Sequence, residues 1–156
     1  MKTVPGKKKP KQRVDESLKK AGKYEVTEDD TFDIRFGLIN REGRWLITEY
    51  VSEDDEDSHE VVFRMWTFEE EVVLRQKSTA YDTIKKIWSI DQDNLNRLKV
   101  QRLLKSWTLD KGNNRLKLLH VDGILSDEGW AAFRKLHPNI VRFILNEMNK
   151  ILEYNG

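Results

Sequence analysis

The chain has 156 residues, of which 38% are hydrophobic and 35% are charged, and its formal net charge is +1. This length is sufficient for one domain with a buried core. Because the chain contains no cysteine, disulfide bonds, thiolate nucleophiles and cysteine-ligated metal centres are excluded within it. No apolar run approaches the ~20 residues that span a bilayer, and no apolar segment follows the amino-terminal lysines. We therefore expect no membrane span and no secretory signal.

The small net charge hides a strong segregation of charge along the chain. Residues 1–23 hold nine Lys or Arg against two acidic residues, whereas residues 24–60 hold thirteen acidic residues against three Arg. A segment with so little to bury does not offset the entropy lost when it becomes ordered. We therefore predict a basic flexible arm at residues 1–23 and a single α+β domain at residues 24–156.

The two charged runs are candidate electrostatic docking sites. The candidates in the arm are Lys7, Lys8, Lys9, Lys11 and Arg13, and those in the acidic run are Glu53, Asp54, Asp55, Glu56 and Asp57. Opposite charges favour an arrangement in which the arm of one copy lies across the acidic run of a neighbour. Alternatively, the arm neutralises phosphates and binds nucleic acid without sequence preference. A solvated acidic loop is the common structural reading of the second run.

The segment after the arm has the two-residue period of a β-sheet. Phe32, Ile34, Phe36 and Leu38 alternate with polar residues or glycine, which places four apolar side chains on one face. The turn sequence NREG and the strand-like sequences RWLITEYV and HEVVFRMW follow. We predict an antiparallel β-meander of about three strands at residues 31–66, with one covered face.

From Thr67 onward the apolar period becomes helical, and we predict about four or five helices in residues 67–154. Thr67 and Glu70 have the spacing of a capping box, in which each side chain bonds the backbone N–H of the other residue. Asp91 or Asp93 is the expected N-cap of a later helix. The apolar residues of that helix are Leu95, Leu98, Leu103, Leu104 and Trp107.

The segment between these two helices has a similar pattern. Thr79 and Asp82 repeat the spacing of a helix start, and Tyr81, Ile84 and Trp88 follow at intervals of three and four. This pattern predicts a further helix. The later sequence RLKLLHVDG is read as an extended connection or a short strand.

The last part of the chain predicts two helices separated by a proline. Ser126 caps the first, His137 precedes Pro138 and ends it, and Pro138 occupies the first turn of the second. Apolar residues of the last helix form one stripe, namely Val141, Ile144, Leu145, Met148, Ile151 and Leu152. The predicted fold class is therefore α+β, a small antiparallel meander followed by a bundle of helices.

The search for reactive groups predicts no catalytic, cofactor-binding or metal site. Asp91 begins a calcium-loop-like sequence, but Arg102 stands where a bidentate glutamate is needed. Ser126 with His120 and Asp122 has the composition of a triad, yet an N-cap role explains the serine. No phosphate-binding glycine motif occurs. We predict a protein that is not an enzyme and has no small-molecule substrate.

Aromatic and apolar residues are the stronger signal for binding other proteins. The five tryptophans fall on or beside predicted apolar faces, where core packing is the common role and interface anchoring the alternative. The candidate interface residues are Trp130, Phe133, Val141, Ile144, Leu145, Met148 and Ile151. Those on the last helix are expected to lie in the core or in a contact between subunits.

Three stretches, FRMWTFEEEVVLRQ, DNLNRLKVQRLLKSWTL and LSDEGWAAFRKLHPNIVRFILNEMN, resemble small proteins of tailed-phage morphogenesis. The likeness is to tail assembly chaperones or small virion proteins, and it covers residues 62–154. It lies in the order of a helix start with tryptophan, a Leu-rich helix and a final helix after proline. The resemblance implies a non-enzymatic role with tail or virion proteins as partners, in the host cytoplasm during assembly or in the virion itself. It transfers no functional residue.

Overall fold

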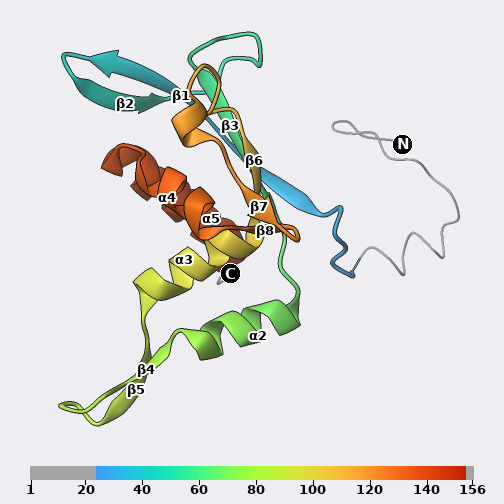
Figure 1. Ribbon diagram of the computed structural model, residues 1–156, viewed down its shortest axis with the longest axis vertical. Helices are drawn as coiled ribbons and strands as arrows, with labels where there is room; N and C mark the ends of the chain where they lie inside the picture. Colours follow the sequence, from blue (N-terminus) through green and yellow to red (C-terminus); the bar gives the residue numbers. More distant parts are fainter. Residues whose placement is uncertain (1–23, 154–156) are drawn as a thin grey trace, which may run out of the picture.

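The computed structural model describes residues 24–153 (Figure 1). The predicted basic arm at residues 1–23, with its docking candidates Lys7, Lys8, Lys9, Lys11 and Arg13, lies outside the described residues. The acidic run and the candidate interface residues all lie within them.

The centre of the fold is a four-stranded antiparallel sheet with the strand order β2-β1-β3-β6. Its strands are β1 (Thr31–Arg41), β2 (Arg44–Thr48), β3 (Ser58–Arg64) and β6 (Leu104–Trp107). The predicted apolar face of the first strand is turned towards the core, because Ile34, Phe36 and Leu38 are buried and Phe32 is half-buried. The opposite face carries exposed polar residues such as Asp33 and Arg35.

The predicted three-stranded meander followed by a helical bundle is wrong, because β3 pairs with β1 and not with β2. The fold is α+β, but the fourth strand comes after two helices, and helices alternate with strands along the chain. Leu104 and Trp107 were assigned to a helix because they lie three residues apart and are both apolar. In β6 both are buried, because a register shift between Val62 and Phe63 of β3 lets two residues three apart face the core.

Four α-helices occur in residues 24–153: α2 (Phe68–Lys77), α3 (Gln92–Leu103), α4 (Asp127–Arg134) and α5 (Pro138–Leu152). The predicted capping box of Thr67 and Glu70 is confirmed, as are the N-cap roles of Asp91 and Ser126. Pro138 occupies the first turn of α5 as predicted. These starts are predictable because each depends on residues at most three positions apart.

The helix predicted at Tyr81, Ile84 and Trp88 is wrong. The segment forms a β-hairpin of β4 (Thr79–Asp82) and β5 (Ile87–Ile90). The Thr79 hydroxyl donates backwards to the Arg75 carbonyl at 2.8 Å, so it caps no following helix. Asp82 Oδ1 instead accepts from the backbone N–H groups of Ile84 and Lys85 at 2.9 and 3.0 Å, which stabilises the turn.

Two smaller elements complete the described chain. A short 3₁₀ helix, η1 (Asn114–Leu116), precedes a minimal hairpin of β7 (His120–Val121) and β8 (Ile124–Leu125). Within the sequence RLKLLHVDG, β7 confirms the predicted short strand, whereas Arg115 and Leu116 belong to the 3₁₀ helix η1, which the prediction did not include.

The hydrophobic core lies between one face of the sheet and the helices. Phe36 of β1 contacts Phe143 of α5, with ring centroids 5.1 Å apart. Ile144 and Met148 have no exposed surface, and Ile140 belongs to the same buried face. Ile151, predicted on this stripe, is exposed instead. The side chains that face the core follow a four-residue spacing from Ile140, which is one position earlier than the predicted stripe begins.

A cluster of charged side chains around the buried Lys99 joins α2, α3 and the end of α5. Lys99 of α3 has no exposed surface, and its Nζ donates to Asn149 Oδ1 at 2.7 Å and to the Glu153 carboxylate. The ammonium also lies 5.3 Å from the ring centroid of Trp66. Burial lowers the pKa of Lys99, and the contacts with Glu153 oppose this effect. The Glu153 carboxylate also accepts from Arg75 of α2, so this cluster connects α2, α3 and the end of α5.

Candidate protein-interaction surface

The hairpin β4–β5, defined as residues 79–90, carries the densest group of exposed large apolar side chains along the described chain. Ile84 at its tip is 90% exposed and Trp88 is 68% exposed. Tyr81, Ile87 and Ile90 are also exposed. The hairpin extends away from the body at the end of the long axis opposite to the β1–β2 turn (Figure 1). Contiguous exposed apolar surface of this kind is typical of binding sites.

The base of the hairpin is held firmly between two helices. Asp91 N donates to the Ser78 carbonyl at 2.7 Å, which continues the ladder beyond the last strand pair. Asn94 of α3 donates to the Lys77 carbonyl at 3.3 Å. Ser78, the C-cap of α2, is buried. The direction in which the hairpin points is therefore set by α2 and α3.

The hairpin also has internal order. Tyr81 and Trp88 are paired across the strands, with ring centroids 5.2 Å apart. Ile90 lies on the same face as this pair, and Ile87 lies on the opposite face, because side chains alternate along a strand. A hairpin of two strands is only marginally stable without a further layer. Cross-strand aromatic pairing supports this one, but it leaves both faces in solvent.

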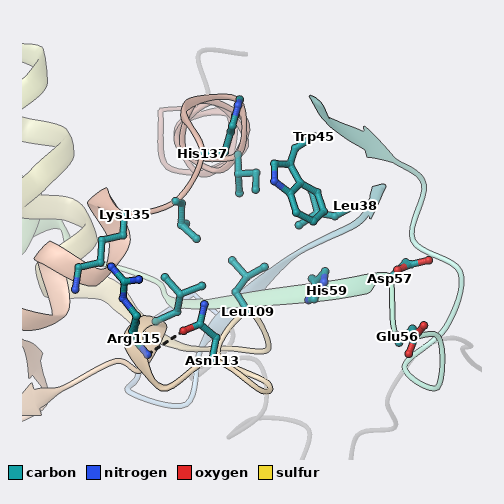
Figure 2. A pocket seen from close by; sticks show the side chains of 13 residues that line it. Leu38, Trp45, Glu56, Asp57, His59, Leu109, Asn113, Arg115, Lys135 and His137 are labelled. Carbon is teal, nitrogen blue, oxygen red and sulfur yellow. Dashed lines mark hydrogen bonds between the residues drawn. The ribbon is translucent and has the colours of Figure 1, made fainter. Parts of the chain in front are cut away.

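A cavity of about 420 Å³ lies away from the hairpin, beside β1 and β2; Figure 2 shows its lining residues. It is bordered by β1 and β2, by the loop after β6, and by the junction of α4 and α5. Its apolar lining residues are Leu38, Trp45, Leu109, Leu116, Leu136 and Ile140. Trp45 lies against Leu38 on one wall, facing the beginning of α5 (Figure 2).

The charges around this cavity are divided between two sides. Glu56 and Asp57, from the loop between β2 and β3, line one side, and Arg115 and Lys135 line the other (Figure 2). His59 lies in the lining and is held by a 3.2 Å contact of Nδ1 with the Thr108 hydroxyl. Burial, and to a lesser extent the positive charge of Lys111, lower the pKa of His59. Both effects favour the neutral form of this imidazole.

The predicted acidic docking residues Glu53, Asp54, Asp55, Glu56 and Asp57 form the loop between β2 and β3. Backbone hydrogen bonds hold the loop to the sheet, since Ser58 N of β3 donates to the Asp55 carbonyl at 3.0 Å and Leu38 N of β1 donates to the Asp57 carbonyl at 2.8 Å. The Glu56 and Asp57 residues are exposed. Whether the basic arm covers them stays a prediction, because the arm lies outside the described residues.

The predicted interface residues are distributed between core and surface. Phe133, Ile144 and Met148 have no exposed surface, so in this chain they pack the core. The half-buried members are Trp130, Val141 and Leu145, and Ile151 is exposed. Trp130 stacks on Phe133 with ring centroids 5.3 Å apart. An interface role for the exposed and half-buried members stays a prediction.

Sequence reasoning missed the hairpin β4–β5 as a binding element. The capping pattern at Thr79 and Asp82 favoured a helix, and Trp88 was assigned to its apolar face. The signal that could have found the hairpin is its composition. The segments TAYD and IWSI are rich in β-branched and aromatic residues, and only the four residues TIKK lie between them.

The groups considered for chemistry have structural partners. Ser126 Oγ donates to the Leu119 carbonyl at 2.8 Å and accepts from Gly129 N at 3.1 Å. His120 Nε2 lies 2.8 Å from the Leu104 carbonyl oxygen, so it does not engage Ser126. Within residues 24–153, no group of three or more His, Asp or Glu residues could hold a metal ion. No helix in that same range has the length and apolar character needed to cross a membrane.

Comparisons of the chain with protein families, with curated proteins and with solved structures found no match. The surface features described above therefore carry the functional argument.

Proposed function

We propose that this protein has a non-enzymatic role in macromolecular assembly and that the hairpin β4–β5 is its docking element. The observation that carries the proposal is the exposure of Ile84 and Trp88 on an element whose base is fixed by α2 and α3. Trp and Tyr are enriched among the residues that dominate binding energies at protein interfaces. A projecting element that is already ordered loses less conformational entropy on binding than a flexible one.

The chemistry of the hairpin favours a protein as the partner. Its side chains offer aromatic and branched apolar groups on both faces, with Lys85 and Lys86 at the tip. Two lysines neutralise at most two phosphates. Non-specific binding to nucleic acid at physiological salt depends on the release of many counterions, so two phosphate contacts are too few to hold it. An apolar protein surface with an acidic edge matches these groups better.

The resemblance to tail assembly chaperones and small virion proteins extends this proposal. On that basis the partners are subunits of a phage tail or virion, which the protein meets in the host cytoplasm or within the particle. The composition of residues 1–23, with nine Lys or Arg, favours non-specific nucleic-acid binding as a second function. Deletion of residues 2–13 tests that second function, because it is expected to abolish retention of DNA or RNA at low salt and to leave hairpin docking intact.

Site-specific photo-crosslinking tests the docking role of the hairpin. A photo-reactive amino acid is incorporated at position 84 in the cells that express the protein. On illumination it is expected to give covalent adducts of defined mass with the docking partner. The same group at position 105, an exposed position of β6 outside both the hairpin and the cavity lining, serves as the matched control and should give none. Adding Trp88→Ser should remove the adducts, because it deletes the aromatic group behind the tip. Equal labelling at both positions, or no adduct at position 84, would contradict the proposal.

A further inference from the structure

We propose that the hairpin β4–β5 of one copy docks into the cavity at the β1–β2 end of a second copy. The inference rests on the proposed docking role of the hairpin and names the partner for it. The receiving surface is the cavity lined by Leu38, Trp45 and Leu136, with Glu56 and Asp57 on one side.

The two surfaces lie at opposite ends of the molecule. The hairpin extends from the junction of α2 and α3, at the end of the molecule opposite to the β1–β2 turn (Figure 1). The cavity is lined by residues of β1, β2 and the start of α5. The hairpin of a chain therefore cannot reach its own cavity, and the contact has to form between copies. Because donor and receiver are different surfaces, such a contact is head-to-tail.

The apolar parts of the two surfaces have complementary form. The donor is convex, with Ile84 at the tip and the Tyr81–Trp88 ring pair behind it. The receiver is concave, has a volume of about 420 Å³ and offers Leu38 and Trp45 on one wall. Cavities of about 300–1,000 Å³ bury most of the surface of a small apolar ligand, so this one is large enough for a branched side chain with part of an aromatic ring.

The charges specify how the hairpin enters. Lys85 and Lys86 follow Ile84 directly, and Glu56 and Asp57 form the acidic side of the cavity. With the lysines on that side, opposite charges meet. In the reverse orientation the lysines would approach Arg115 and Lys135, and juxtaposed like charges disfavour an interface. The charge distribution thus selects one orientation.

Head-to-tail docking has a consequence for the assembly. Each copy that has donated its hairpin still has an empty cavity, and each copy that has received one still has a free hairpin. Growth therefore continues until a ring closes or a filament forms. A self-complementary dimer would saturate both surfaces at once and is not expected.

A charge exchange tests the inference with purified protein. The receiver variant Glu56→Lys with Asp57→Lys and the donor variant Lys85→Glu with Lys86→Glu each oppose like charges across the contact. Each variant is expected to weaken self-association at least about tenfold in analytical ultracentrifugation, because close charge pairs at interfaces couple strongly. Both pairs of substitutions in one chain should restore association. Association of either single-sided variant at wild-type strength, or no recovery in the combined variant, would overturn the inference.

A mixing experiment tests the head-to-tail geometry independently. The apolar donor variant Ile84→Ser with Trp88→Ser keeps an intact cavity, and the receiver variant Glu56→Lys with Asp57→Lys keeps an intact hairpin. At a protein concentration at which neither variant associates by itself, their mixture should form a 1:1 dimer and nothing larger, because only one productive contact remains. Unchanged circular dichroism and melting temperature are the controls for folding, since all four positions are exposed.

The outcomes separate this inference from the proposed docking role. If the receiver variant assembles like the wild type and the apolar donor variant does not, the hairpin docks elsewhere, so the inference fails and the docking role stands. The inference also fails, and the docking role also stands, if the wild type stays monomeric at millimolar concentration while position 84 forms adducts with a different protein. A monomeric wild type with no adduct at position 84 contradicts both.

Discussion

The body of the protein and the hairpin β4–β5 use the same residue types for opposite purposes. In the body, Trp66, Trp107 and Phe63 are buried against the sheet or the helices. In the hairpin, Tyr81 and Trp88 contact each other but stay 45% and 68% exposed. Burial of apolar area drives folding, so the hairpin surface contributes little to the stability of the single chain and remains available for binding. Aromatic content alone therefore does not separate core from interface; position in the fold does.

The largest loss of stability is expected from substitutions on the buried face of α5. Replacing Ile144 and Met148 together by alanine removes two side chains with no exposed surface, and we expect a loss of more than about 4 kcal/mol in the free energy of unfolding. Chemical denaturation of the double variant measures this. A midpoint equal to that of the wild type would show that the body does not depend on this packing, and the comparison with the hairpin would fail.

A somewhat smaller loss of stability is expected from a substitution in the buried charged cluster around Lys99. Lys99→Ala leaves the Glu153 carboxylate with Arg75 alone and leaves Asn149 without its donor, and we expect a loss of about 3 kcal/mol. Thermal or urea unfolding gives the value. Lys117→Ala, at an exposed lysine, is the matched control and should change stability by less than about 0.5 kcal/mol. Equal effects at the two lysines would contradict the structural role of Lys99.

The pH dependence of stability is expected to reflect Glu70. Hydrogen bonds from Arg64, and then from Arg102 and Thr67 N, lower the pKa of this carboxyl from 4.5 to about 2 against the opposing effect of burial. Because the pKa in the folded state is depressed, the stabilisation is complete above about pH 4.5 and is lost as the pH falls towards 2. The shift corresponds to about 3 kcal/mol, since one pKa unit is worth about 1.4 kcal/mol.

Glu70→Gln isolates this charge effect, because glutamine also completes a capping box at this position. The variant should be less stable than the wild type at pH 7, and the difference should shrink as the pH approaches 2. Urea unfolding at several pH values measures both curves. A difference that is constant between pH 7 and pH 2 would show that the ion pairs with Arg64 and Arg102 do not stabilise the fold.

The smallest effect on stability is expected in the hairpin. Trp88→Ser removes the ring contact with Tyr81 but opens no cavity in the core, so the free energy of unfolding should fall by less than about 1 kcal/mol. The same substitution should reduce assembly strongly if the hairpin is a docking element. A large stability loss with unchanged assembly would reverse the comparison between the two regions.

The parts of the fold that sequence reasoning predicted are those governed by near neighbours. The capping box at Thr67 and Glu70, the N-cap at Ser126 and the helix start at Pro138 depend on residues within one turn. The apolar face of β1 was predictable for a similar reason, since the strict alternation over residues 32–38 has few alternative readings.

The parts that were not predictable depend on distant partners. Residues 104–107 follow a helix and have helical spacing, yet they form β6 because the edge of β3 is available for pairing. Residues 79–90 have a helix-like start, yet the side chain of Asp82 and the bond from Asp91 N to the Ser78 carbonyl stabilise a hairpin. In both segments the local preferences are nearly balanced, so long-range contacts decide.

The candidate binding surfaces likewise combine features set by short stretches of sequence with features set by contacts between distant segments. The sequence by itself determined that the chain is rich in exposed charge, that Glu53–Asp57 form an acidic run, and where most helices begin, because these properties depend on composition and short spacings. Only the tertiary structure decided which tryptophans are buried, that the acidic run borders an apolar cavity, and that the hairpin projects at the opposite end. Those features arise from the packing of segments far apart in the chain, and burial is a property of that packing rather than of any residue alone.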